Sequence, residues 1–256
     1  MIPRIVPPLT DVTALVTRPA QQAETLCSEI VRLGGVAIAF PCISIEPLDA
    51  PEAAEHDLVV FVSVNAVAHG VRLVRKGPGT RIAAIGKATA AALASLQMPA
   101  DVVPEHGFDS EALLAHPKLA LARGARVLIV HGAGGRELLQ QTFIARGLTV
   151  ETREVYRRVR PVVDERQCAE IEARWADEGI DVVTLTSIET LHNLTAMLSE
   201  QGRRLLASTP LLVASRRIGQ AAAEAGLSGE VIVASGADDA SMIGALALWR
   251  TRARMP

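Results

Sequence analysis

The chain has 256 residues, of which 49% are hydrophobic and 3% are aromatic, and its formal net charge at pH 7 is −2. This length allows one large domain or two modest ones, with cores built mainly from aliphatic side chains. The small net charge argues against an extensive nucleic-acid interface, and no apolar run approaches the roughly 18 residues of a membrane span.

The three cysteines, Cys27, Cys42 and Cys168, share no metal-ligand spacing. Their odd number favours reduced thiols, as in cytoplasmic proteins. The first residues, MIPRIVPPLTD, lack the uninterrupted apolar stretch of a signal peptide. We therefore expect a cytoplasmic protein with no membrane and no nucleic acid among its partners.

Strand-like and helix-like segments alternate along most of the chain. Strands are predicted at 12–17, 57–62, 81–85, 101–103, 126–130, 181–186, 211–214 and 231–234. Helices are predicted at 20–33, 64–75, 87–97, 109–115, 134–146, 164–178, 188–200, 216–225 and 239–252. This alternation predicts an α/β protein with parallel sheets flanked by helices.

Two extended segments, 36–48 and 149–161, have no helix of their own. We expect them to pair as a two-stranded antiparallel ladder between two similar domains, with a cleft between the domains. The expected boundaries are 1–36 with 162–256 for a discontinuous first domain, 50–148 for the second, and 37–49 with 149–161 for the ladder. The alternative is two sequential halves that divide near residue 120.

Two internal echoes support the pair of similar domains. The segment DLVVFVS at 57–63 returns as DVVTLTS at 181–187, and LVTRP at 15–19 returns as LIVHG at 128–132. Each copy predicts a parallel strand, a turn and a helix. Ligands of open α/β sheets bind at the carboxyl ends of the strands, so these turns are where a site is expected.

Polar residues follow several of these strand ends. Each Ser or Asn among them is also an ordinary helix N-cap, so only the whole set indicates a ligand. The set suits a ligand with many carboxylates or phosphates, because helix N-termini and cations attract anions. Its members are Arg18, Ser63, Asn65, Lys87, Thr89, Ser187, Ser215 and Arg217.

The segment GAGGREL at 132–138 opens a predicted helix after a strand. Gly132, Gly134, Gly135 and Arg136 would offer backbone N–H groups and a charge to an anion. The segment lacks the Lys-Ser/Thr pair of a P-loop, so a plain tight turn is the alternative. Tyr156, the only tyrosine, lies on the second extended segment. It is either a hydrogen-bonding group for a ligand or a packing residue.

Taken in order, seven segments make the chain resemble the uroporphyrinogen-III synthase family. They are LVTRP, FPCISIEP, FVSVNAV, AIGKATAAAL, GAGGREL, EVYRR and LTSIETL. The resemblance implies a lyase of tetrapyrrole (haem) biosynthesis that uses no metal and no cofactor. Its substrate is hydroxymethylbilane, which loses water and closes to uroporphyrinogen III with inversion of ring D.

The resemblance also implies roles for individual residues. Tyr156 matches the tyrosine proposed to assist departure of the hydroxyl. Substrate-binding positions are implied at Arg18, Ser63, Thr89, Arg136 and Ser187. A monomer is expected, with hand-over of the substrate from hydroxymethylbilane synthase.

The chain departs from the family pattern at three places. Family members often have Arg at the position of His131 and Pro or Gln at that of Val64, and the turn at 215–219 reads SRRIG. Three other functions remain open: a non-catalytic tetrapyrrole-binding regulatory domain of this fold, a two-domain small-molecule binding protein, and a nucleotide-dependent transferase.

Overall fold

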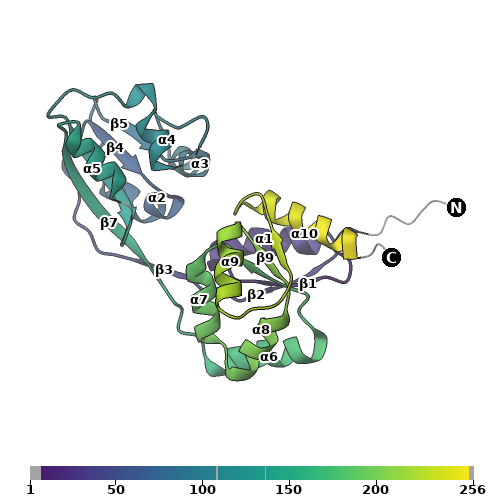
Figure 1. Ribbon diagram of the computed structural model, residues 1–256. Helices are drawn as coiled ribbons and strands as arrows, with labels where there is room; N and C mark the ends of the chain where they lie inside the picture. Colours follow the sequence, from purple (N-terminus) through teal and green to yellow (C-terminus); the bar gives the residue numbers. More distant parts are fainter. Residues whose placement is uncertain (1–6, 108, 136, 254–256) are drawn as a thin grey trace. The chain divides into compact units, whose positions relative to one another are not determined.

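The structure is a computed structural model that describes residues 7–107, 109–135 and 137–253. Contacts between Cα atoms divide the chain into two units (Figure 1). Unit 1 combines Met1–Ser44 with Arg160–Pro256, and unit 2 is the continuous segment Ile45–Val159. Each unit has its own five-stranded sheet. The two sheets, in which parallel pairing dominates, confirm the predicted α/β class.

The sheet of unit 1 has the order β10-β9-β8-β1-β2, and all four of its neighbouring pairs are parallel. Its strands are β1 (Thr13–Val16), β2 (Val36–Ala39), β8 (Val182–Leu185), β9 (Leu211–Val213) and β10 (Val231–Val233). Its helices are α1 (Ala20–Arg32), α6 (Glu165–Glu178), α7 (Ile188–Met197), α8 (Glu200–Ser208), α9 (Arg216–Glu224) and α10 (Asp239–Ala253). Apolar side chains of α1 and α10 pack on one face, and those of α6 to α9 pack on the other.

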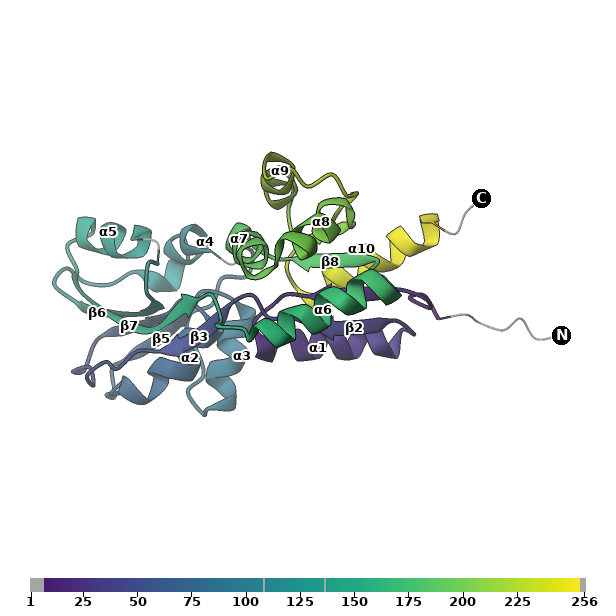
Figure 2. The ribbon, with the colours of Figure 1, turned by 90° about the horizontal axis from the view of Figure 1, so that it is seen from below.

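The sheet of unit 2 has the order β3-β7-β6-β4-β5. Its strands are β3 (Ser44–Pro47), β4 (Leu58–Phe61), β5 (Arg81–Ala84), β6 (Arg126–Gly132) and β7 (Thr149–Val159). Its helices are α2 (Val64–Gly70), η1 (Val71–Leu73), α3 (Lys87–Ser95), α4 (Ser110–Leu114), η2 (Pro117–Leu119) and α5 (Leu138–Ala145). Helices α2 and α3 cover one face of this sheet, and α4 and α5 cover the other (Figure 2).

The repeated segments occupy equivalent places in the two sheets. The order β9-β8-β1-β2 in unit 1 corresponds to β5-β4-β6-β7 in unit 2. Asp181 accepts a hydrogen bond of 2.7 Å from the N–H of Thr13, and Asp57 accepts one of 2.7 Å from the N–H of Arg126. Each Asp therefore fixes the start of the neighbouring strand in the same way, and the echo in the sequence is a structural duplication.

The two extended segments pair with each other over a shorter stretch than expected. The first one contributes β2, which pairs in parallel with β1 inside the sheet of unit 1. Of the first segment, only β3 pairs with β7. Leu48 N donates to Val155 O at 3.0 Å and Arg157 Nε donates to Glu46 Oε2 at 2.8 Å, so this pair runs antiparallel. Most of β7 pairs in parallel with β6, because it continues the sheet after α5.

Three predicted elements also differ in extent. The helix expected at 134–146 begins only at Leu138. The helix expected at 188–200 ends at Met197, because Leu198 is extended and Ser199 starts α8 as its N-cap. The strand expected at 101–103 is reduced to one bridge between Ala83 and Val102. None of the helices in the described ranges is long and apolar enough to cross a membrane.

Candidate functional site

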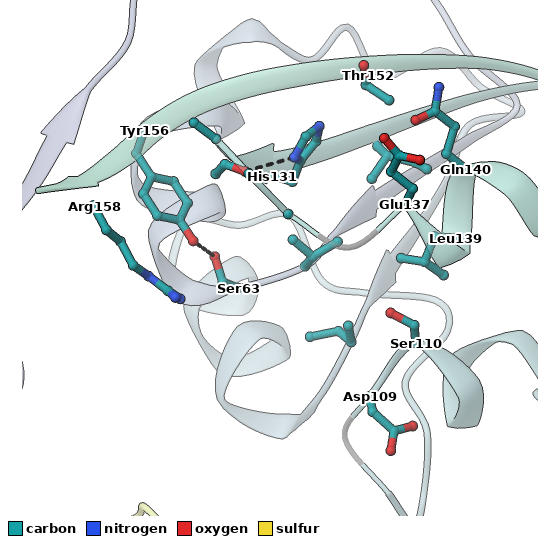
Figure 3. Close-up of a pocket in the computed structure, with 17 residues that line it drawn as sticks. Ser63, Asp109, Ser110, His131, Glu137, Leu139, Gln140, Thr152, Tyr156 and Arg158 are labelled. Atoms are coloured by element: carbon teal, nitrogen blue, oxygen red, sulfur yellow. Dashed lines mark hydrogen bonds between the residues drawn. The ribbon is translucent and has the colours of Figure 1, made fainter. Parts of the chain in front are cut away.

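A cavity of about 450 Å³ opens in unit 2 at the carboxyl ends of β4 and β6 (Figure 3). Its wall combines the start of α2, the glycine turn after β6, the starts of α4 and α5, and one edge of β7. Among the expected site residues, the structure brings five together here: Ser63, Gly132, Gly134, Gly135 and Tyr156. Parallel strands end at the same edge of a sheet, which explains why turns far apart in the sequence meet at this cavity.

Tyr156 is one of the side chains that line this cavity. Its residue is only 4% exposed, and its hydroxyl lies 3.2 Å from Ser63 Oγ. Ser63 is the N-cap of α2 and accepts a 2.9 Å hydrogen bond from the N–H of Ala66. The hydroxyl of Tyr156 is therefore held at the N-terminus of a helix, in the wall of the cavity.

The ring of Tyr156 rests directly on Gly132. A Cβ atom at Gly132 would lie 2.4 Å from Cζ of Tyr156, which no real contact allows. The pairing of β6 with β7 shifts at this point, from His131 opposite Glu154 to Gly132 opposite Tyr156. Bulges of this kind re-aim side chains near sites. This register shift directs the tyrosine over the glycine.

The turn after Gly132 offers backbone donors to the cavity. Gly134 has φ +71°, a left-handed conformation that glycine adopts without strain. The N–H of Ala133 donates to Tyr156 O at 2.8 Å, whereas those of Gly134 and Gly135 have no acceptor within the described residues. These donors precede the N-terminus of α5, where the helix dipole also favours an anion. The predicted Arg136 lies outside the described residues.

His131 lines the same cavity between Tyr156 and the group of Glu137, Gln140 and Thr152 (Figure 3). Its Nδ1 lies 2.9 Å from the carbonyl oxygen of Gly132. A carbonyl only accepts hydrogen bonds, so Nδ1 carries the proton. The sequence interpretation treated His131 only as a departure from a pattern and missed its place in the site.

Other lining residues were missed as well, although two had a signal. Arg158 follows Tyr156 by two residues, and alternate residues of a strand share a face. Asp109 is the N-cap of α4, and its carboxylate accepts from the N–H of Ala112 at 2.8 Å. Thr152 and Gln140 had no local signal, since only the packing of α5 against β7 places them here.

Three predicted residues of unit 2 lie elsewhere. Thr89 is 4% exposed within α3, Lys87 is exposed at the start of that helix, and Asn65 is half-buried on α2. None of these three residues belongs to the described residues that line the cavity. Their contact with a substrate stays a prediction.

The predicted residues of unit 1 lie at the carboxyl ends of its strands. Ser187 is the N-cap of α7 and accepts from Thr190 N at 3.0 Å. Ser215 precedes α9, and its side chain makes no capping hydrogen bond within the described part of the chain. Arg217 is exposed on α9. These positions also stay predictions as substrate contacts.

Arg18 has a different environment from the one expected of a substrate contact. It is 4% exposed, and its guanidinium bonds the carboxylate of Asp239 and the carbonyl of Ala237. Hydrogen bonds from the hydroxyl and the N–H of Ser241 hold the pKa of nearby Asp238 below its ordinary value. Arg18 therefore anchors the segment that begins α10.

Metal ligands do not cluster in the described ranges. No three His, Cys, Asp or Glu side chains of residues 7–107, 109–135 and 137–253 are placed to hold an ion. The groups that line the cavity are hydroxyls, an imidazole, carboxylates, a guanidinium and backbone N–H groups. They are suited to hydrogen bonding and to holding a charged ligand in one orientation.

Comparison with known proteins supplies the family. A family model described as Uroporphyrinogen-III synthase HemD matches residues 24–244. The uroporphyrinogen-III synthase of Salmonella typhimurium is 36% identical over 255 residues, which cover 91% of this chain and 98% of that protein. The enzyme of Escherichia coli is 35% identical over 246 residues, with the same two coverages of 91% and 98%.

Solved structures share the fold. A mutant uroporphyrinogen III synthase of Thermus thermophilus matches with a TM-score of 0.57 at 20% identity, covering 93% of this chain and 99% of that one. The Helicobacter pylori synthetase matches with a TM-score of 0.59 at 12% identity, covering 95% and 100%. Because the family model spans most of the chain and relatives at 35% and 36% identity match nearly their whole length, the chain belongs to the uroporphyrinogen-III synthase family.

Proposed function

We propose that this protein is a lyase that closes hydroxymethylbilane to uroporphyrinogen III, with loss of water and inversion of ring D. One structural observation carries the proposal beyond family membership. The only tyrosine of the chain places its hydroxyl in a cavity lined by backbone donors, 3.2 Å from the cap of a helix. This arrangement suits a reaction in which a hydroxyl group leaves and a polyanionic chain is held in one geometry.

The main demand of this reaction is orientation. The pyrrole nitrogens expel the hydroxyl with little help, and closure without an enzyme gives the uninverted isomer. Holding a flexible chain so that a less accessible carbon reacts lowers the entropic part of the barrier. The substrate carries eight carboxylates. The N–H groups of Gly134 and Gly135, next to the N-terminus of α5, are placed to bind one of them.

Tyr156 is the proposed acid. Its phenol donates a proton to the departing hydroxyl while the lone pair of the pyrrole nitrogen breaks the C–O bond, and water leaves. Ring D attacks the resulting cation through the carbon that already carries its link to ring C, which gives a spiro intermediate. The bond from that carbon to the linking methylene then breaks, and the methylene bonds to the opposite α-carbon of ring D. Closure at the inverted position releases one proton from carbon, which restores the phenol. Atoms balance, because one substrate gives one macrocycle and one water.

Ser63 is proposed to orient that phenol. Its oxygen already accepts the hydrogen bond from Ala66 N, so its own proton is available for the oxygen of Tyr156. A tyrosine that accepts from Ser63 keeps its proton for the substrate. The N–H of Ala66 thus donates to Ser63, Ser63 donates to Tyr156, and Tyr156 donates to the leaving group.

The finer features of the proposal follow the family. We propose a monomer that acts in the cytoplasm and receives its labile substrate from hydroxymethylbilane synthase. A non-catalytic regulatory role is less well supported, because Tyr156 is present and lines the cavity. The described residues that line the cavity include no lysine of the kind that a nucleotide-dependent transferase would place beside a phosphate.

A product assay tests the function. Purified protein is supplied with freshly made hydroxymethylbilane, and the type I and type III isomers are separated by chromatography. We expect mainly type III, at a rate that increases with enzyme concentration. A sample without enzyme gives the spontaneous type I background. Production of type I alone, at the background rate, would refute the proposed activity.

A further inference from the structure

His131 has one ring nitrogen fixed by the backbone and one nitrogen left for a ligand. The bond between Nδ1 and the carbonyl of Gly132 sets the tautomer, so in the neutral ring Nε2 has a lone pair and no proton. Within the described ranges, Nε2 has no hydrogen-bond partner. Protonation of the ring turns Nε2 into a charged donor without moving the ring.

The surroundings of His131 fit a carboxylate. The turn that contains Gly132 packs against the ring, and a Cβ at Gly135 would lie 3.1 Å from Nδ1. The glycine therefore leaves room for the imidazole beside the backbone donors of the turn. Thr152 and Gln140 line the same cavity and add neutral hydrogen-bonding groups on one side of the ring (Figure 3).

We propose that His131 binds a carboxylate of the substrate through Nε2 and makes substrate affinity depend on pH. This inference rests on the proposed function and names one group that recognises the substrate. The neutral imidazole repels an anion with its lone pair, whereas the imidazolium donates a charge-assisted hydrogen bond. His131 is thus a binding residue whose contribution is switched on by a proton.

Several titratable groups line the cavity or pair with the strand of His131. Asp109 and Glu137 come from the starts of α4 and α5, and Glu154 lies opposite His131 in the pairing of β6 with β7. Tyr156 and Arg158 come from β7. Two of the carboxylates are already engaged: Asp109 bonds Ala112 N, and Glu137 bonds the side-chain amide of Gln141. Neither of these two hydrogen bonds involves Nε2 of His131.

The expected pH dependence of substrate affinity follows from the chemistry of an imidazole and of a carboxylate. Histidine is the side chain that changes charge between about pH 5 and 8. Carboxylates with reference pKa values near 4 stay ionised throughout this range. Affinity should therefore rise as pH falls, because a proton on the imidazole adds a charged donor while the carboxylates of the substrate stay ionised.

The test measures KM and kcat between pH 6 and 8.5, with hydroxymethylbilane generated in the assay and the isomers separated. His131→Gln removes the titrating group, and His131→Arg supplies a permanent charge. His192→Gln is the control, because His192 is an exposed residue of α7. We expect KM of the wild type to fall about tenfold towards pH 6, the size of one charge-assisted hydrogen bond. The control should show the same profile.

The variants should separate binding from folding. His131→Gln should have a high KM at every pH, and His131→Arg a low KM at every pH, with kcat changed less than KM in both. If His131→Gln unfolds at a lower temperature than the wild type, the KM of His131→Arg, expected to be low at every pH, still tests the proposal. Parallel KM profiles of wild type and either variant would overturn the role of His131. Absence of type III product from the wild type would instead refute the proposed function.

Discussion

Three neighbours hold Tyr156 in the position from which it can act. Ser63 bonds its hydroxyl, Gly132 leaves space for its ring, and His69 lies with its ring centroid 6.2 Å away. Two of these contacts come from the carboxyl ends of β4 and β6, and the third from the end of α2. The acid of the proposed reaction is therefore positioned by the ends of several elements and not by its own strand alone.

Removal of the phenolic hydroxyl tests the proposed acid. In Tyr156→Phe the ring still packs on Gly132, but no proton reaches the leaving group. We expect kcat to fall about tenfold to a hundredfold, roughly 1.4 to 2.8 kcal/mol in the barrier, with a smaller change in KM. Type III should remain the main product, because orientation is unchanged. Full activity of Tyr156→Phe, with loss of stability in Tyr156→Ala, would make Tyr156 a packing residue.

A methyl group at Gly132 should displace the tyrosine. The added Cβ would lie 2.4 Å from Cζ of Tyr156, so the ring must move away from Ser63. We expect Gly132→Ala to lower the free energy of unfolding by about 1–3 kcal/mol, as overpacking does, and to lower kcat. Denaturant midpoints and steady-state kinetics measure both. Gly79→Ala is the control, because no atom lies within 4 Å of that Cβ; equal behaviour of the two variants would contradict the account.

The thiols should differ in reactivity. Burial raises the pKa of the Cys42 thiol, which is 0% exposed, and burial also raises the pKa of Cys27 and of Cys168. A raised pKa lowers the thiolate fraction, and the thiolate is the nucleophile. At pH 8 we expect iodoacetamide to label Cys27 and Cys168 in the native protein, and Cys42 only after unfolding. Mass spectrometry of labelled peptides measures this order, which early labelling of Cys42 would contradict.

The raised pKa of Cys42 also makes the free energy of unfolding depend on pH. The folded chain keeps the Cys42 proton above the pH at which the unfolded chain loses it. The free energy of unfolding is therefore unaffected by this thiol below the ordinary thiol pKa of about 8.5, and it decreases as pH rises above that value. Cys42→Ala should reduce this alkaline loss of stability in denaturant titrations.

Helix boundaries in unit 1 depend on tertiary hydrogen bonds. Glu172, a buried residue of α6, accepts from the N–H of Ser199 at 2.8 Å and from its hydroxyl. Ser199 in turn caps α8 by accepting from Gly202 N at 3.2 Å. The helix predicted at 188–200 therefore ends at Met197, and a further helix that was not predicted, α8, follows it, because a carboxylate from α6 completes the cap of α8.

Two helical glycines should respond in opposite ways to alanine. A Cβ at Gly202 would lie 2.3 Å from the carboxylate of Glu172, whereas no atom lies within 4 Å of one at Gly244 in α10. We expect Gly244→Ala to stabilise the protein by about 0.5–1 kcal/mol, the difference in helix propensity. Gly202→Ala should instead destabilise it by about 1–2 kcal/mol, because buried hydrogen bonds are broken.

Thermal and denaturant unfolding of the two variants measures these changes. Each variant is the control of the other, since the chemical change is the same. Stabilisation by Gly202→Ala would show that Glu172 moves aside without cost, which would contradict the role given to its hydrogen bonds.

Each unit of the molecule has the features of an independent domain. Two apolar clusters pack on the two faces of the sheet in unit 1, and two others do so in unit 2. The chain enters and leaves unit 2 once, whereas unit 1 combines two separate segments. A compact body with its own core can in principle fold alone.

The segment 45–159 should therefore fold when it is expressed by itself. We expect a cooperative denaturant transition and dispersed amide resonances, because its sheet and both of its clusters lie within the segment. The segment 160–253 should not fold alone, since β1 and β2 of its sheet come from the other end of the chain. An unfolded 45–159 would show that its core needs the rest of the protein.

Local patterns in the sequence were sufficient for the α/β class. Apolar runs of strand length and amphipathic helical patterns can be recognised from residues close together in the chain. The echo of DLVVFVS in DVVTLTS marks equivalent strands. Ser63 and Ser187 were recognisable as helix caps because capping involves residues three apart. The importance of Tyr156 followed from a resemblance of ordered motifs.

Long-range packing decided the rest. Strand order placed β2 in a sheet instead of a connector, a register shift directed Tyr156 onto Gly132, and the pairing with Asp239 buried Arg18. The same packing brought His131 and Arg158 into one cavity. The sequence by itself thus determined the type and order of most elements, several of their caps and the repeat, because these depend on neighbouring residues. Only the tertiary structure decided which turns share a cavity, since that depends on hydrogen bonds between strands that lie far apart in the chain.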